Sequence, residues 1–309
     1  MKINEIISKR NKVWKHKEEI PSWVNLDEVG LDQFFTSSEV AKTYYKKMCD
    51  FLKSKNIKLK DCLFIEPSAG KGAFFNLLPK NQRIGIDIYS LDNEIIEMDF
   101  LSWTPPKTDK KIIFIGNPPF GYRAWLALAF LNHASKFADY VFFILPMSFQ
   151  SEAKGSPKSR VKNLKLVFSE VIKENAFRTL EDKKVKVNAL WQCWEKGINE
   201  NLIIDDMKEF VDIFTVDQRE ERLCGHKKID KADFFIQRTF YNDPPSLVKN
   251  FSEVKYVCGY GVILKKNKTK ILNILKKIDW VKYSNLTTHN CRHISIYHIK
   301  KALIEGGIK

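Results

Sequence analysis

The segment Asn117-Pro118-Pro119-Phe120 combines residue types that can hold a planar heterocycle bearing an amino group. Its two prolines stiffen the backbone and have no N–H to donate, so nearby carbonyls remain free to accept hydrogen bonds. The side-chain oxygen of Asn117 and the carbonyl of Pro118 could accept both amine hydrogens while the ring stacks on Phe120. A rigid turn between a strand and a helix would use the same residues, so the segment alone leaves both interpretations open.

A second candidate is the glycine-containing loop Glu66-Pro67-Ser68-Ala69-Gly70-Lys71-Gly72, which follows a short apolar run. Glycines let the backbone approach a ligand closely, and a helix starting after them would favour an anionic group. The loop has neither the GxxxxGK[ST] pattern of a P-loop nor the GxGxxG pattern of dinucleotide sites. The loop therefore indicates an adenosine-containing cofactor.

Two acids follow further along the chain. Asp87, at the end of the next apolar run, is placed to bind ribose hydroxyls. Asp99 could accept a hydrogen bond from an adenine amine while Phe100 packs against the ring. Each acid alone more often caps a loop, but the order and spacing of the set favour a cofactor site.

The elements that must position these residues alternate between strand-like and helix-like patterns. Predicted strands cover 62–66, 83–88, 111–116, 140–145 and 184–194. A helix is expected to begin within 73–78, and another spans 124–137. This alternation predicts an α/β fold with a doubly wound, mostly parallel sheet, in which ligands bind at the carboxyl ends of the strands.

The chain is expected to divide into an arm at 1–30, an α/β domain at 31–199 and a smaller, basic α+β domain at 200–309. In the last part, strands are predicted at 233–239 and 256–264 and helices at 268–278 and 294–304. No internal repeat is visible.

The charge is strongly basic, with 52 Lys and Arg against 37 Asp and Glu and a net charge of +15. Residues 250–309 hold 12 basic and 3 acidic residues, a net of +9. Such an excess favours a polyanionic partner, although a lysine-rich surface without a partner gives the same composition. In the segment 151–163, Lys154, Lys158 and Arg160 are candidates for phosphate contacts, and a solvated loop is the alternative.

The six cysteines form no CxxC pair, and the N-terminus has no apolar signal-peptide core. The longest apolar runs are too short to span a bilayer. We therefore expect a soluble, cytoplasmic protein with no membrane partner. A cluster of His289, Cys291, His293 and His298 suggests zinc, but its HxCxH spacing does not match common zinc sites, so no metal is expected.

These motifs together resemble the N6-adenine-specific DNA methyltransferase family with its motifs in the gamma order. Leu31 to Thr36, including Phe35 and Thr36, resembles the family's N-terminal cofactor motif, with Ser37 where the family often has proline. Thr36 to Glu39 also has the pattern of a capping box that opens a helix. The loop from Glu66 resembles motif I, Asp87 the ribose acid, Asp99-Phe100 the adenine motif and Asn117 to Phe120 the catalytic motif. Phe177 resembles the aromatic residue that stacks on the far face of the target base.

The resemblance covers residues 31–195 and implies S-adenosylmethionine as cofactor and a Rossmann-like class I methyltransferase fold. It implies direct in-line transfer of a methyl group to the N6 amine of an adenine flipped out of DNA. The basic part at 200–309 takes the place of the family's target-recognition domain, and a restriction endonuclease would be a separate chain. Two alternatives stay open: an RNA N6-adenine methyltransferase, and a non-catalytic relative that binds nucleic acid.

Overall fold

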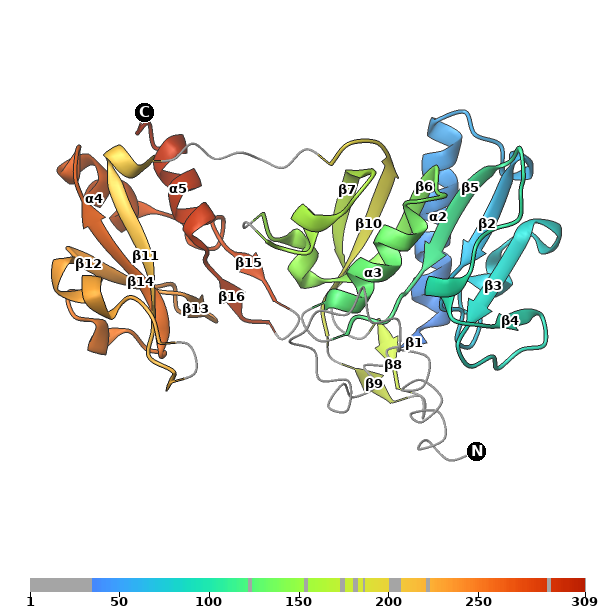
Figure 1. The fold of residues 1–309 in the computed structure, drawn as a ribbon, viewed down its shortest axis with the longest axis horizontal. Helices are drawn as coiled ribbons and strands as arrows, with labels where there is room; N and C mark the ends of the chain where they lie inside the picture. Colours follow the sequence, from blue (N-terminus) through green and yellow to red (C-terminus); the bar gives the residue numbers. More distant parts are fainter. Residues whose placement is uncertain are drawn as a thin grey trace. The chain divides into compact units, whose positions relative to one another are not determined.

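The structure is a computed structural model that describes most of the chain after residue 34. The described residues are 35–121, 124–152, 155–172, 176–179, 183–185, 187–199, 207–220, 223–287 and 290–308. The predicted arm at 1–30 and residues 31–34 of the N-terminal cofactor motif lie outside them. The chain forms two compact units, one of residues 1–150 and 160–200, the other of residues 151–159 and 201–309 (Figure 1).

The first unit is built on a seven-stranded sheet with the order β4-β3-β2-β5-β6-β10-β7. Its strands are β2 (Cys62–Glu66), β3 (Arg83–Asp87), β4 (Ile95–Glu97), β5 (Lys111–Gly116), β6 (Tyr140–Pro146), β7 (Leu164–Ile172) and β10 (Ala189–Lys196). The first five strands in this order pair in parallel, and β10 runs antiparallel to both β6 and β7. The mostly parallel sheet confirms the predicted α/β fold class.

The order of the sheet reverses beside β2. The chain places β3 on one side of β2 and β5 on the other, with Ile65 opposite Phe114 across the β2–β5 pair. The turns after Glu66 and after Gly116 therefore leave the sheet side by side at its carboxyl edge. Open α/β sheets bind ligands at such a reversal.

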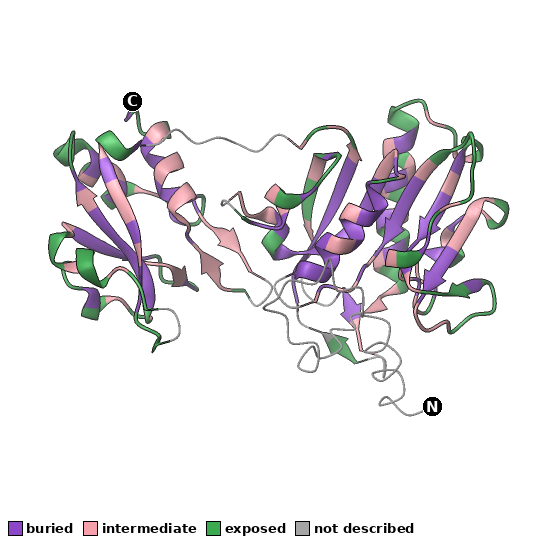
Figure 2. Cartoon of the chain, in the orientation of Figure 1, coloured by how far each residue is buried: buried purple, intermediate pink, exposed green. Residues whose placement is uncertain are grey.

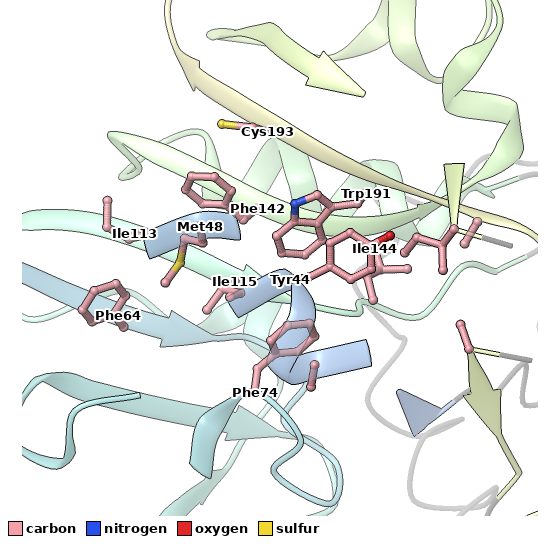
Figure 3. Close-up of a cluster of buried hydrophobic side chains, with 14 of the residues drawn as sticks. Tyr44, Met48, Phe64, Phe74, Ile113, Ile115, Phe142, Ile144, Trp191 and Cys193 are labelled. Atoms are coloured by element: carbon pink, nitrogen blue, oxygen red, sulfur yellow. The ribbon is translucent and has the colours of Figure 1, made fainter. Parts of the chain in front are cut away.

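Helix α2 (Ser38–Ser54) covers part of the sheet through an apolar stripe of Ala41, Tyr44, Met48 and Leu52. The stripe meets a core that includes Trp191 of β10, whose ring lies 4.9 Å from that of Tyr44 (Figure 3). The predicted helix is confirmed, but its cap is different. Ser37 is the N-cap and accepts a hydrogen bond from Val40 N at 3.4 Å, because Thr36 is already part of strand β1 (Phe35–Thr36).

The helix expected to begin within residues 73–78 does not form. A 3₁₀ helix, Phe75–Leu77, takes its place and ends before Pro79. The stretch is too short for an α-helix because Gly72 has a positive φ of 74° and the residue before a proline avoids helical geometry. The glycine loop is therefore not followed by an α-helix, and no helix dipole supports an anion there.

The predicted strand at 184–194 is two strands. Lys184–Val185 forms β9, which pairs with β8 (Phe177–Arg178), and β8 in turn pairs with β1. Strand β10 begins at Ala189, and its first six residues are buried, as expected for a strand covered on both faces (Figure 2). In Figure 1 the small sheet β1-β8-β9 lies beyond the carboxyl ends of β5 and β6.

Helix α3 (Trp125–Ala134) lies within the predicted range 124–137 and is buried almost throughout. It follows the Asn117–Phe120 segment after Gly121 and Ala124, which have positive φ angles of 67° and 61°. A left-handed alanine is uncommon, so this connection is conformationally strained.

Among its described residues, the second unit contains two small antiparallel sheets and two α-helices, consistent with the predicted α+β class. The sheets have the orders β11-β14-β12 and β13-β16-β15. Their strands are β11 (Val211–Asp217), β12 (Phe234–Gln237), β13 (Thr239–Phe240), β14 (Cys258–Leu264), β15 (Asn285–Leu286) and β16 (Arg292–His293). The helices are α4 (Lys268–Lys277) and α5 (Ile296–Glu305). Among the helices of the described residues, none has the length and apolarity to cross a membrane.

Candidate functional site

The glycine loop is held at both ends by the carboxyl group of Glu66. This side chain is 2% exposed, and its Oε2 accepts a hydrogen bond from the backbone N–H of Phe75 at 2.5 Å. Burial raises the pKa of Glu66 well above its ordinary value, although hydrogen bonds from the Phe75 and Phe74 N–H groups oppose the shift. Because Glu66 is the first residue of the loop and Phe75 lies just beyond its last residue, their hydrogen bond closes the loop.

Asp87 holds the middle of the loop. Its carboxylate is 6% exposed and accepts hydrogen bonds from the N–H of Gly70 at 2.8 Å and of Tyr89 at 3.0 Å. A further bond from Ala69 N to Ile86 O, 3.0 Å long, fixes the loop against β3. In this structure Asp87 positions the loop that the sequence analysis assigned to the cofactor, and its contact with a ribose stays a prediction.

The catalytic motif predicted from the sequence lies directly beside this loop. The hydroxyl of Ser68 donates to the backbone carbonyl of Asn117 at 3.1 Å. A Cβ atom on Gly116 would lie only 3.3 Å from Glu66 Cγ, so the two strand ends pack closely. The fold thus brings together two segments that sequence analysis singled out independently.

Phe120 and Phe177 are both buried, at 6% and 0% exposure, and belong to the same apolar cluster. The carbonyl of Phe120 accepts a hydrogen bond from Ala127 N at 3.3 Å, which ties the motif to the start of α3. Pro118 and Pro119 occupy the irregular stretch between β5 and α3. Stacking of a base by the two phenylalanines stays a prediction.

Strand β1 brings Phe35 and Thr36 to the same edge. The Phe35 ring lies against Gly70, where a Cβ atom would be 3.1 Å from Phe35 Cε1, and Lys71 Nζ lies 5.2 Å from the centre of the ring. Thr36 is paired with Phe177 across β1 and β8. Its hydroxyl is buried and has no hydrogen-bond partner among the described residues, which is unusual unless a ligand supplies one.

Asp99 and Phe100 follow β4, the strand next to β3 in the sheet. Asp99 caps a short 3₁₀ helix, Phe100–Ser102, by accepting a hydrogen bond from Leu101 N at 3.0 Å. The Phe100 ring is 2% exposed and packs against the rings of His133 and Phe130, with centroid distances of 4.8 and 5.1 Å. The contacts seen for Phe100 are to protein rings, and its packing against adenine stays a prediction.

The basic residues of the segment 151–163 that are expected to contact phosphate are distributed over both units. Lys158 belongs to the second unit and forms an ion pair with Glu152 at 3.4 Å. Arg160 belongs to the first unit and is exposed, while Lys154 lies outside the described residues. Their contacts with phosphate stay predictions.

Sequence analysis missed one contact and one polar side chain of this region. Ser68 was noted only as part of the loop, because a bond to a residue 49 positions away leaves no local signal. Gln150 ends the 3₁₀ helix Met147–Gln150 directly after β6, and its side-chain oxygen is buried without a hydrogen-bond partner among the described residues. The sequence signal that could have identified Gln150 is its position as a polar residue at the end of the largely apolar run that begins at Tyr140.

In the second unit, Cys291 Sγ lies 3.7 Å from His293 Nε2 and 2.9 Å from Thr287 Oγ1. His289 lies outside the described residues. Within the part of the chain that the structure describes, no three His, Cys, Asp or Glu side chains come together in a way that could hold a metal ion.

Comparison with known proteins gives structural neighbours only, since no protein-family model and no curated protein sequence matches the chain. One neighbour is a Pyrococcus horikoshii protein provisionally described as an RNA methyltransferase. It is 16% identical over 54% of this chain and 89% of its own, with a TM-score of 0.40. Another, from Thermoplasma acidophilum, is 14% identical over 52% of this chain and 95% of its own, with a TM-score of 0.35. The candidate site therefore rests on the fold of the chain itself. Two loops, after β2 and after β5, are joined by a hydrogen bond where the strand order of the α/β sheet reverses.

Proposed function

We propose that this protein is an S-adenosylmethionine-dependent methyltransferase that methylates the N6 amine of adenine in nucleic acid, with DNA as the favoured substrate. The observation that carries the proposal is the hydrogen bond from Ser68 to Asn117. This bond joins the loop 66–72, which we propose holds the cofactor, to the segment 117–120, which we propose binds the amine. Methyl transfer requires the donor and the acceptor to lie next to each other, and these two adjacent segments would hold them so.

The residues present fit the proposed cofactor. The buried hydroxyl of Thr36 requires a polar partner, and the backbone of Gly70 lies between Phe35 and Asp87. Thr36, the loop 66–72, Asp87 and Asp99 would hold the group. When bound, it supplies a methyl group already activated by a positively charged sulfur. A cationic group near Glu66 would favour the ionised form of its carboxyl.

The chemistry then requires orientation of the amine rather than a covalent intermediate. The Asn117 side-chain oxygen and the Pro118 carbonyl would accept the two amine hydrogens, which favours a pyramidal nitrogen with its lone pair directed at the methyl group. Phe120 and Phe177 would hold the two faces of the ring. Most of the rate would come from positioning and from stabilisation of developing charge. A base in a duplex must first leave the stack, at a cost of a few kcal/mol.

The basic charge supports a nucleic-acid substrate. The net charge of the whole chain is +15, and the segment 250–309 contributes +9 of it. In α4, Lys268, Lys276 and Lys277 are exposed. Phosphate contacts from such residues would add affinity that falls as the salt concentration rises.

The deciding experiment offers methyl-labelled S-adenosylmethionine with unmethylated duplex DNA, single-stranded DNA or total RNA. We expect labelled N6-methyladenine in DNA from the wild-type protein, and a rate lower by about 100-fold or more for Asn117→Ala, as for loss of a group that stabilises the transition state. Asn81→Ala, an exposed site in the short 3₁₀ helix Lys80–Gln82 before β3, is the matched control and should keep full activity. Label only in RNA would overturn the DNA assignment. No label in any nucleic acid, despite cofactor binding, would overturn the proposed activity.

A further inference from the structure

Ser68 occupies a distinctive position within the glycine loop. Its side chain is only partly buried, and its Oγ donates to the carbonyl oxygen of Asn117 at 3.1 Å. The parallel pairing of β2 with β5 sets this distance, since Ile65 lies opposite Phe114 and both chains turn out of the sheet shortly afterwards. The contact thus depends on the central sheet rather than on local sequence.

The part of the loop around Ser68 is fixed to the opposite neighbour of β2. Gly70 N donates to Asp87, and Ala69 N donates to the carbonyl of Ile86, both at the end of β3. Ser68 therefore lies between a segment anchored to β3 and a segment that leaves β5. A displacement of the loop by a bound group would reach Asn117 through the Ser68 hydroxyl.

The bond acts on the backbone that orients the amine acceptors. Holding the Asn117 carbonyl fixes the plane of the peptide between Asn117 and Pro118, since peptide units are planar. The Pro118 ring restricts the next φ angle. The hydrogen bond therefore restrains the backbone from which the Asn117 side chain and the Pro118 carbonyl project.

We propose that Ser68 is a positioning residue, whose hydroxyl orients Asn117 and couples the glycine loop to the site of methyl transfer. This role rests on the proposed function. In this role Ser68 contacts neither the methyl group nor the amine nitrogen. It acts through the backbone of Asn117.

The test compares Ser68→Ala with Ser68→Thr, which retains a hydroxyl at the same atom. Ser90→Ala is the matched control, since the Ser90 hydroxyl also bonds a backbone carbonyl, that of Asp92, in a loop that leaves β3. With saturating cofactor, we expect single-turnover methylation of DNA to fall about 3- to 10-fold in Ser68→Ala, the size for one neutral hydrogen bond. Ser68→Thr should recover most of the rate, and Ser90→Ala should match the wild type.

A second readout separates positioning from general damage to the loop. Calorimetric affinity for S-adenosylmethionine should change less than about twofold in Ser68→Ala, because the backbone bonds of Gly70 and Ala69 remain. In an Asn117→Ala background, Ser68→Ala should cause no further loss of rate, because the group it positions is gone. If Ser68→Ala does not fold, Ser68→Cys keeps the size with a weaker donor and should lose part of the rate.

The proposal would be overturned by an unchanged rate in Ser68→Ala, or by a loss explained entirely by weaker cofactor binding. A further loss in the Asn117→Ala background would likewise show that Ser68 acts on something else. In each case transfer by the wild-type protein leaves the proposed function intact. Absence of transfer by the wild type would overturn the proposed function and the role of Ser68 with it.

Discussion

The hydrogen bonds at the candidate site of the first unit join distant loops, whereas Asp217 and His298 of the second unit close a local turn and a helix cap. At the site of the first unit, Ser68 bonds Asn117 at a separation of 49 positions and Asp87 bonds Gly70 at a separation of 17. In the second unit, Asp217 bonds Arg219 and His298 bonds Ser295, two and three positions away. Local bonds of this kind close turns and cap helices. The bonds of the first unit join two loops at the carboxyl edge of a parallel sheet, and the proposed chemistry rests on that location.

The largest effect on this comparison is expected from acid. Burial lowers the pKa of His298 to about 4, and the nearby charge of Lys301 acts in the same direction. In the folded state the Nδ1 atom of His298 accepts a hydrogen bond from the Ser295 N–H in the cap of α5. The pKa of His298 in the folded protein lies below its ordinary value of 6.5. Its contribution to the free energy of unfolding is therefore complete above pH 6.5 and is lost as the pH falls towards 4. The loss approaches about 3 kcal/mol for a shift of this size. Urea unfolding at pH 7 and pH 4.5 measures it.

His298→Gln should remove most of this pH dependence in the second unit, whereas His226→Gln, at an exposed position, should leave it unchanged. Equal pH dependence in the wild type and His298→Gln would mean that another group controls the acid response.

A smaller effect is expected from releasing the glycine loop. Asp87→Ala removes the acceptor for the Gly70 and Tyr89 N–H groups. We expect affinity for S-adenosylmethionine to fall about 10- to 100-fold, as for loss of a hydrogen bond to a charged group, and more than the transfer rate at saturation. Calorimetry would measure the affinity, with exposed Asp92→Ala as the control. Unchanged affinity would contradict the assignment of this loop to the cofactor.

The smallest effect concerns Glu66, whose pKa is raised well above its ordinary value by burial. The folded state therefore favours the protonated carboxyl of Glu66. Its contribution to the free energy of unfolding is complete below the pKa of the unfolded chain and is lost as the pH rises through the pKa of the folded protein. Glu66→Gln should make thermal stability less dependent on pH on the alkaline side, and exposed Glu97→Gln should not. A melting temperature of Glu66→Gln that follows the wild type at every pH would show that Glu66 is ionised in the free protein.

Sequence analysis succeeded where a structure is specified by neighbouring residues. The strands at 62–66 and 111–116 have the predicted bounds, because each is a short apolar run closed by Pro67 or by Asn117-Pro118. The predicted ranges for α4 and α5 also agree to within two residues, since each shows a clear helical period.

Sequence analysis failed where the local structure depends on how elements distant in the sequence pack or pair. The helix at 73–78 had the right composition, but Pro79 and the short return to β3 leave room for only a 3₁₀ turn. Ser37 rather than Thr36 caps α2, because pairing with Phe177 draws Thr36 into a strand. For the same reason the Ser68–Asn117 bond could not be predicted, since it depends on the register of β2 and β5.

The assignment of residues 151–159 to the second unit has a practical consequence for dissecting the protein. The main chain passes between the units three times, near residues 150, 160 and 200. Glu152 in the short segment is ion-paired with Lys301 of α5 at 3.7 Å. A fragment beginning at residue 201 would lack this piece of its own fold, and a fragment ending at 200 would carry it without its partners. Truncation at residue 200 thus damages both halves, and point substitutions are the sounder way to separate their roles.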